Sequence, residues 1–230
     1  MSIDLLEQAA AALKGFLDEV VFVGGATIVL WITDPGAPSP RPTKDVDVIV
    51  EVTSLLAYED FQRRLRAAGF SEDQESGIIC RWDGPGGLVL DAMPAAPHLA
   101  GFVTRWQSAS LPHAVTHRLP SRAKIRAVPA PYLLGTKFEA FDARGKGDYV
   151  GSRDFADIVA LADGRAELHD ELAAAEPELR AYVAERLESH LRADGFLDGV
   201  FAALSPDAAS QARAEEIVLP RLDALVSVRP

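Results

Sequence analysis

Two aspartates separated by one residue, Asp45 and Asp47, have the clearest potential for chemistry in this 230-residue sequence. Successive side chains of a strand point to opposite faces, so both carboxylates would lie on one face of a strand over 45–50. The other residues of that segment are apolar, as in a strand buried on both faces. Two adjacent carboxylates repel each other, and a hard divalent cation, Mg²⁺ or Mn²⁺, would relieve this repulsion. The pair therefore predicts a metal site for phosphoryl or nucleotidyl transfer.

A third carboxylate, Asp91, follows the apolar run Leu88–Leu90. On a strand next to 45–50, it would lie within reach of Asp45 and Asp47. Three carboxylates can hold two divalent ions, one on a triphosphate and one that lowers the pKa of an attacking hydroxyl. The alternative is that Asp91 only caps a turn at the end of its strand.

A glycine pair, Gly24-Gly25, follows the apolar run Val20–Val23 and predicts a strand that turns sharply into a helix. Without side chains, the backbone N–H groups of these glycines could approach a phosphate, which a helix N-terminus also favours. The pair could equally form a tight turn that needs a positive φ. Thr43, shortly before the two aspartates, is a further candidate for phosphate contact.

Lys137 lies four residues from both Leu133 and Phe141, and so on the apolar stripe of a predicted helix over 132–142. An ammonium in such a place needs a partner, which could be a bound triphosphate or a structural salt bridge, for example with Asp157. Ser152 can cap the next predicted helix, and Asp154 would complement its dipole in the first turn. Asp154 and Asp157 share one side at three-residue spacing, and face either a substrate cleft or only the protein.

The pattern around these residues predicts an α/β (α+β) fold, in which helices flank a mixed sheet and a helical domain follows. The boundary falls near residue 129 and gives domains 1–129 and 130–230. Residues 33–43 contain four prolines and a glycine and predict an exposed loop. The strands are expected at 20–23, 45–50, 78–82, 88–92, 114–119 and 125–128. The helices are expected at 5–17, 25–32, 55–68, 132–142, 153–162, 166–174, 179–192 and 208–225. Thr53 or Ser54 can cap the helix over 55–68.

The composition is typical of a globular protein and excludes several other classes. Hydrophobic residues make up 48% and charged residues 25% of the chain, as in soluble globular proteins. The single cysteine, Cys80, excludes an internal disulfide framework and a multi-cysteine zinc site. No apolar run has the length of a membrane helix and no signal-peptide pattern opens the chain, so we expect a cytoplasmic protein without membrane contact. The net charge of −11 gives no overall attraction to nucleic acid. The basic segment 117–126 is either a local contact for such a partner or only a solvated face.

Together these motifs resemble the nucleotidyltransferase superfamily with the DNA polymerase β-type fold. Its signature is a glycine pair, a helix, Asp-x-Asp on the next strand and a later acidic residue, which correspond here to Gly24-Gly25, Asp45-Val46-Asp47 and Asp91. Lys137-Phe138-Glu139-Ala140, followed by Arg153-Asp154 and Asp157-Ile158, is similar to the AbiEii/AbiGii-type toxin branch. The resemblance covers about residues 20–162. The chain departs from the compact versions by its long, proline-rich connection between Gly25 and Asp45 and by the insertion Ala143–Gly151.

The resemblance implies transfer of a nucleoside monophosphate from an NTP to an acceptor. Mg²⁺ or Mn²⁺ would bind Asp45, Asp47 and Asp91. The substrate site would contain Gly24, Gly25, Thr43, Lys137, Arg153, Asp154 and Asp157. An RNA such as tRNA, or a protein, would be the acceptor, and an antitoxin could be a partner of a toxin of this kind. The alternatives are a catalytically silent nucleotide-binding or interaction module of the same fold, and a phosphohydrolase that uses the same aspartates. The oligomeric state is not predicted.

Overall fold

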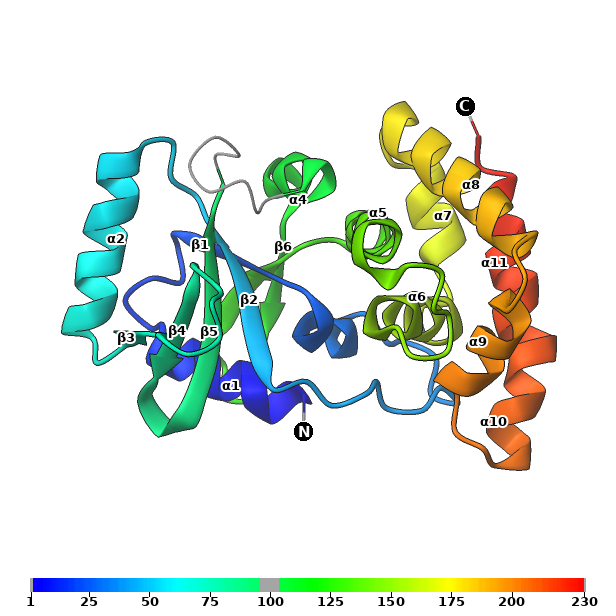
Figure 1. Ribbon diagram of the computed structural model, residues 1–230, viewed down its shortest axis with the longest axis horizontal. Coiled ribbons are helices and arrows are strands. Elements are labelled where there is room, and N and C mark those ends of the chain that lie inside the picture. Colours follow the sequence, from blue (N-terminus) through cyan, green and yellow to red (C-terminus); the bar gives the residue numbers. More distant parts are fainter. Residues whose placement is uncertain (1, 96–103, 230) are drawn as a thin grey trace. The chain divides into compact units, whose positions relative to one another are not determined.

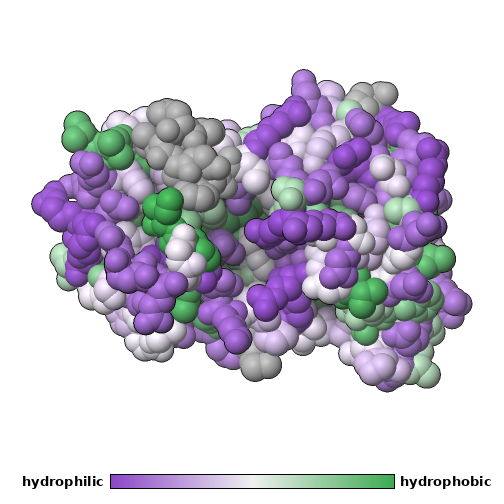
Figure 2. All heavy atoms as spheres, in the orientation of Figure 1, coloured by the Kyte–Doolittle hydropathy of each residue, from purple (hydrophilic) through white to green (hydrophobic). Residues whose placement is uncertain are grey.

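A computed structural model describes residues 2–95 and 104–229 and shows an α+β protein with two compact units. The first unit comprises Met1–Leu30 and Pro42–Pro129, and the second comprises Trp31–Arg41 and Ala130–Pro230. The predicted fold class, a mixed sheet flanked by helices, is confirmed. On the face of the molecule in Figure 2, hydrophilic residues predominate and hydrophobic ones are scattered between them.

The described residues of the first unit contain a seven-stranded mixed sheet in the order β3-β4-β5-β2-β1-β7-β6. β2 is parallel to β5 and β1 to β7, and the other pairs are antiparallel. β2 and β5 lie side by side in Figure 1. The strands are β1 (Val20–Val23), β2 (Asp45–Val50), β3 (Ser71–Glu72), β4 (Arg81–Gly84), β5 (Leu88–Pro94), β6 (Val115–Arg118) and β7 (Lys124–Ala127).

The strand expected at 78–82 begins only at Arg81, because the Arg81 N–H closes a turn onto the Ile78 carbonyl. The helix expected at 25–32 is a short 3-10 helix, and β3 was not predicted. Ser54 caps α2 by accepting a hydrogen bond from the Ala57 N–H, as its position predicts. The helical elements of this unit are α1 (Ser2–Ala12), η1 (Gly25–Leu30), α2 (Leu55–Ala67), η2 (Pro85–Gly87), α4 (Arg105–Ser110) and η3 (Leu111–His113).

The second unit is helical. Its helix α9 was not predicted, because it is only eight residues long and lies between Gly195 and Pro206. The helix expected at 208–225 contains a π-helical segment in its middle. The elements are α5 (Ala130–Ala140), η4 (Phe141–Gly145), α6 (Arg153–Gly164), α7 (Leu168–Ala173), α8 (Pro177–Leu191), α9 (Phe196–Ala203), α10 (Ala208–Arg213), η5 (Ala214–Val218) and α11 (Leu219–Val226).

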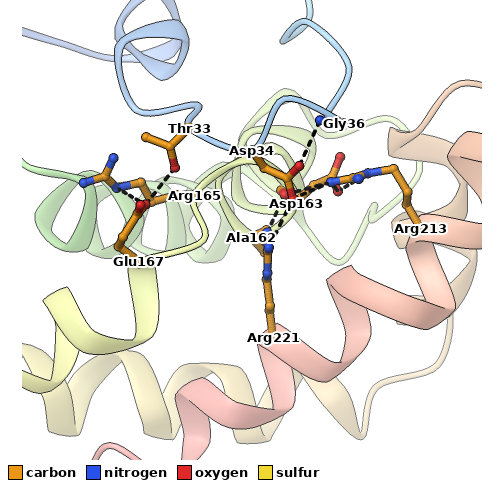
Figure 3. Close-up of polar contacts among 9 residues, drawn as sticks. All are labelled: Thr33, Asp34, Gly36, Ala162, Asp163, Arg165, Glu167, Arg213 and Arg221. Atoms are coloured by element: carbon orange, nitrogen blue, oxygen red, sulfur yellow. Dashed lines mark hydrogen bonds and ion pairs between the residues drawn. The ribbon is translucent and has the colours of Figure 1, made fainter.

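The proline-rich segment Trp31–Arg41 belongs to this helical unit, although it directly follows η1 in the sequence. The N–H groups of Thr33 and Asp34 both donate to the carbonyl of Gly164, at 2.8 and 3.0 Å. The Asp34 carboxylate pairs with the guanidinium groups of Arg213 and Arg221, as Figure 3 shows. The segment has no regular secondary structure, as expected, but backbone hydrogen bonds and ion pairs hold it in place.

Candidate active site

The three carboxylates of the first unit lie on one face of its sheet. β2 and β5 are parallel, and their register places Asp47 opposite Asp91. Asp45 is two residues from Asp47 on the same strand, so its side chain points to the same face. On β2, Val46 between the two aspartates and Val48–Val50 after them are buried. Sequence reasoning anticipated that Asp91 follows a neighbouring strand, and the register brings the three residues together.

Arg81, which sequence reasoning missed, holds two of these carboxylates. It lies on β4 directly opposite Asp91. Its Nε and Nη2 atoms donate to the two oxygens of Asp91, each at 2.8 Å, and Nη2 also donates to Oδ2 of Asp45 at 2.8 Å. Hydrogen bonds and charge from Asp91, with the charge of Asp45, raise the pKa of Arg81 above its usual value. Near Arg81, the only feature of the sequence that points to this ion pair is the position of a charged residue between Cys80 and Trp82, which are both buried.

Gly24 is required where β1 ends. Its φ of +81° lies in the left-handed region, and a Cβ atom at this position would lie 2.0 Å from Oδ2 of Asp47. The Thr27 hydroxyl donates to the Gly24 carbonyl at 2.8 Å as η1 begins. The tight turn with positive φ, one of the two interpretations that the sequence left open, is therefore present, and its backbone passes against the Asp47 carboxylate.

Gly25 and Thr43 are the two other residues of the first unit that the sequence predicted for the substrate site. Gly25 is buried at the start of η1 and has no positive φ. The Thr43 hydroxyl is buried and has no hydrogen-bond partner within residues 2–95 and 104–229. A buried hydroxyl without a partner is costly, so Thr43 has an unused donor and acceptor two residues before Asp45.

The remaining predicted residues belong to the second unit, where Lys137 is buried in a network of ion pairs. Its Nζ lies 3.1 Å from Oδ1 of Asp154 and 2.6 Å from Oδ2 of Asp157. Arg41 also binds Asp157 through two atoms, each at 2.9 Å, and Arg144 binds Asp154 at 2.7 and 3.0 Å. Of the two partners considered for Lys137, the structural salt bridge is the one observed. A contact with triphosphate stays a prediction.

The same network sets the charge state of Asp154. Burial alone would raise the pKa of this carboxyl, but the hydrogen bond from Arg144 and the charges of Lys137 and Arg144 bring it below its usual value. Ser152 caps the helix as predicted, since its hydroxyl accepts a hydrogen bond from the Phe155 N–H. Arg153, another predicted substrate contact, is exposed at the start of this helix.

Asp45, Asp47 and Asp91 have the ligand atoms that a hard divalent cation prefers, and the strand register makes them neighbours. Carboxylate oxygens are its preferred ligands, and Asp47 and Asp91 are direct neighbours across two paired strands. Within the described residues, no three acidic, histidine or cysteine side chains are arranged as a ready metal site. In this arrangement the cation on Asp45 and Asp91 is the guanidinium of Arg81.

Comparison with known proteins does not identify a relative. No protein-family model matches the chain, and no curated protein matches it. In the part of the chain that the structure describes, no helix has both the length and the apolar character to cross a membrane.

Proposed function

We propose that this protein is a nucleotidyltransferase that moves a nucleoside monophosphate from an NTP to an acceptor. The observation that carries the proposal is the arrangement where β1 ends beside the paired strands β2 and β5. There, Asp47 is paired with Asp91, and the backbone of Gly24 leaves no room for a side chain beside the Asp47 carboxylate. The resemblance of these motifs to the DNA polymerase β-type superfamily supports the same reaction.

In this proposal Asp45, Asp47 and Asp91 hold the divalent cation. When bound, Mg²⁺ or Mn²⁺ would neutralise triphosphate charge and lower the pKa of the acceptor hydroxyl. Asp91 accepts the proton of the acceptor hydroxyl, whose oxygen forms the new bond to the α-phosphorus of the NTP while the bond from this phosphorus to the leaving pyrophosphate breaks. The Gly24 turn brings backbone without a Cβ atom against the Asp47 carboxylate, and the Thr43 hydroxyl supplies a hydrogen bond to a phosphate oxygen.

The acceptor class in this proposal is RNA, for example tRNA, or a protein. The β6–β7 hairpin supports an anionic acceptor, because Arg118, Arg122 and Lys124 are exposed there in a protein of net charge −11. A cytoplasmic toxin with an antitoxin partner is the physiological form of the same proposal.

The test is transfer of label from α-³²P-NTPs to total cellular RNA and protein by wild type, Asp47→Asn and Asp18→Asn. Asp18 is exposed before β1 and serves as the matched control for loss of one negative charge. We expect Asp47→Asn to lower the transfer rate by about 10³-fold and Asp18→Asn to leave it unchanged, because one lost metal ligand costs several kcal/mol of transition-state stabilisation. Equal transfer by wild type and Asp47→Asn would refute the proposal.

A catalytically silent nucleotide-binding module is the second candidate, and the pairing of Arg81 with Asp45 and Asp91 favours it. A guanidinium that stays on these carboxylates would prevent them from binding metal while the fold and the Gly24 turn persist. Calorimetric binding of Mg-NTP, without transfer to any acceptor in the labelling experiment, would support this candidate over the enzyme.

A further inference from the structure

Arg81 makes a three-bond contact with the carboxylates that the proposed function assigns to metal. Both oxygens of Asp91 and one oxygen of Asp45 accept hydrogen bonds from this guanidinium. The side chains are partly accessible, with exposed fractions of 18% for Arg81, 11% for Asp91 and 37% for Asp45. The three hydrogen bonds therefore have good distances, but water and ions can reach the side chains that form them.

A divalent cation and the guanidinium compete for the same oxygens. A carboxylate has lone pairs for more than one partner, but two positive centres at hydrogen-bond distance from the same oxygens repel each other strongly at the edge of a protein. Binding of metal to Asp45 and Asp91 therefore favours departure of Arg81 from them.

Acidic side chains near Arg81 offer the displaced guanidinium other carboxylate partners. Asp83 is exposed two residues further along β4, on the same face as Arg81. The N–H of Asp73 donates to the Arg81 carbonyl at 3.1 Å. Hydrogen bonds from Ser76 and Glu75 lower the pKa of the Asp73 carboxyl, and the charge of Arg81 adds to this. Asp73 and Asp83 line the same surface cavity of about 520 Å³, together with Glu72, Gln74, Glu75 and Ser76.

We propose that Arg81 is a built-in counter-ion that a divalent cation must displace from Asp45 and Asp91, and that it thereby sets the metal concentration at which the site fills. This inference rests on the proposed function, since it places the metal on the same carboxylates. Without metal, Arg81 neutralises Asp45 and Asp91 and holds them in place. With metal, Arg81 leaves them for the acidic cavity lined by Asp73 and Asp83.

The experiment measures binding of Mn²⁺ alone to the full chain, from the electron paramagnetic resonance signal of free Mn²⁺. Wild type, Arg81→Met and Arg105→Met are compared. Arg105 is exposed on α4 in the same unit, so its variant loses the same charge at a residue with no assigned role in the site. We expect Arg81→Met to bind Mn²⁺ about tenfold more tightly than wild type, and Arg105→Met to bind it like wild type. Equal or weaker binding by Arg81→Met would overturn the inference.

Asp47→Asn separates this inference from the proposed function. If wild type binds Mn²⁺ and Asp47→Asn does not, the metal site stands, and only the affinity of Arg81→Met decides the role of Arg81. If neither wild type nor Arg81→Met binds Mn²⁺ at millimolar concentration, the metal site and the counter-ion inference both fall.

Arg81→Met leaves Asp45 and Asp91 without their cation, so its folding needs a control. We expect a lower melting temperature than wild type without Mn²⁺ and a larger rise when Mn²⁺ is added, because the ion replaces the lost charge. If Arg81→Met does not fold, Arg81→Lys decides, because an ammonium keeps the charge but cannot donate in the same bidentate way. Tighter Mn²⁺ binding by Arg81→Lys than by wild type supports the inference, and equal or weaker binding overturns it.

Discussion

In each unit of the molecule, a basic side chain bridges two of the aspartates that the sequence singled out, but the two clusters differ in burial. In the second unit, Lys137 and its partners have side-chain exposures of 9%, 7% and 1%. In the first unit, Arg81 is 18% exposed and its partner Asp45 is 37% exposed. The cation of the first cluster can therefore exchange with ions from solution, whereas that of the second is enclosed by protein.

The partners of the two clusters differ as well. Asp154 and Asp157 each bind a second cation, Arg144 and Arg41 respectively, so their negative charge is fully matched within the unit. Among the described residues, Asp45 and Asp91 share a single guanidinium, that of Arg81. Two carboxylates that share one cation attract a further cation more than a buried network in which each carboxylate has two. The two clusters therefore differ in exposure and in charge balance.

The largest expected effect on stability tests the enclosed cluster. Lys137→Met leaves buried carboxylates without one cation, and breaking a buried pair in this way costs about 3–5 kcal/mol. Arg81→Met removes the same charge from Asp45, which is 37% exposed, and from Asp91, which is 11% exposed, and should cost less, about 1–3 kcal/mol. Urea unfolding followed by far-UV circular dichroism gives both values. If Lys137→Met loses no more stability than Arg81→Met, the contrast between the two clusters is wrong.

A second, smaller effect concerns the glycine turn against Asp47. Gly24→Ala adds a Cβ atom in the left-handed region and within 2.0 Å of the Asp47 carboxylate. Gly77→Ala is the matched control, since Gly77 has a φ of +72° but nothing within 4 Å of an added Cβ atom. We expect about 1–2 kcal/mol of backbone strain in both variants.

Only Gly24→Ala should displace the Asp47 carboxylate. We therefore expect it to weaken Mn²⁺ binding and nucleotidyl transfer, while Gly77→Ala keeps both at the wild-type level. Retention of full Mn²⁺ affinity by Gly24→Ala would show that the close approach of Gly24 to Asp47 has no part in the site.

The smallest expected effect is the pH dependence that Asp154 contributes. Its pKa in the folded protein is below the usual value, because Arg144 and Lys137 offset the effect of burial. The unfolded chain therefore binds the proton more readily, so this contribution to stability is complete above about pH 4 and is lost as the pH falls through the folded pKa. Urea midpoints over the acidic range should fall less steeply for Asp154→Asn than for wild type. Identical slopes would count against this origin of the acid sensitivity.

Local patterns in the sequence determined much of the framework. Alternation over 45–50 placed both aspartates on one face, and Ser54 and Ser152 marked two helix starts, because strand periodicity and capping depend only on residues a few positions apart. The glycine turn after β1 was recognisable for the same reason, since a positive φ is a property of one residue.

Only the tertiary structure decided which charges meet. Arg81 reaches Asp91 and Asp45 because β4 pairs with β5 and β5 with β2, and Arg41 reaches Asp157 across more than a hundred residues of sequence. Lys137 had two candidate partners in the sequence, and the packing of α5 against α6 selected the aspartates. Strand register and helix packing result from many weak contacts summed over the whole fold, so no short motif encodes them.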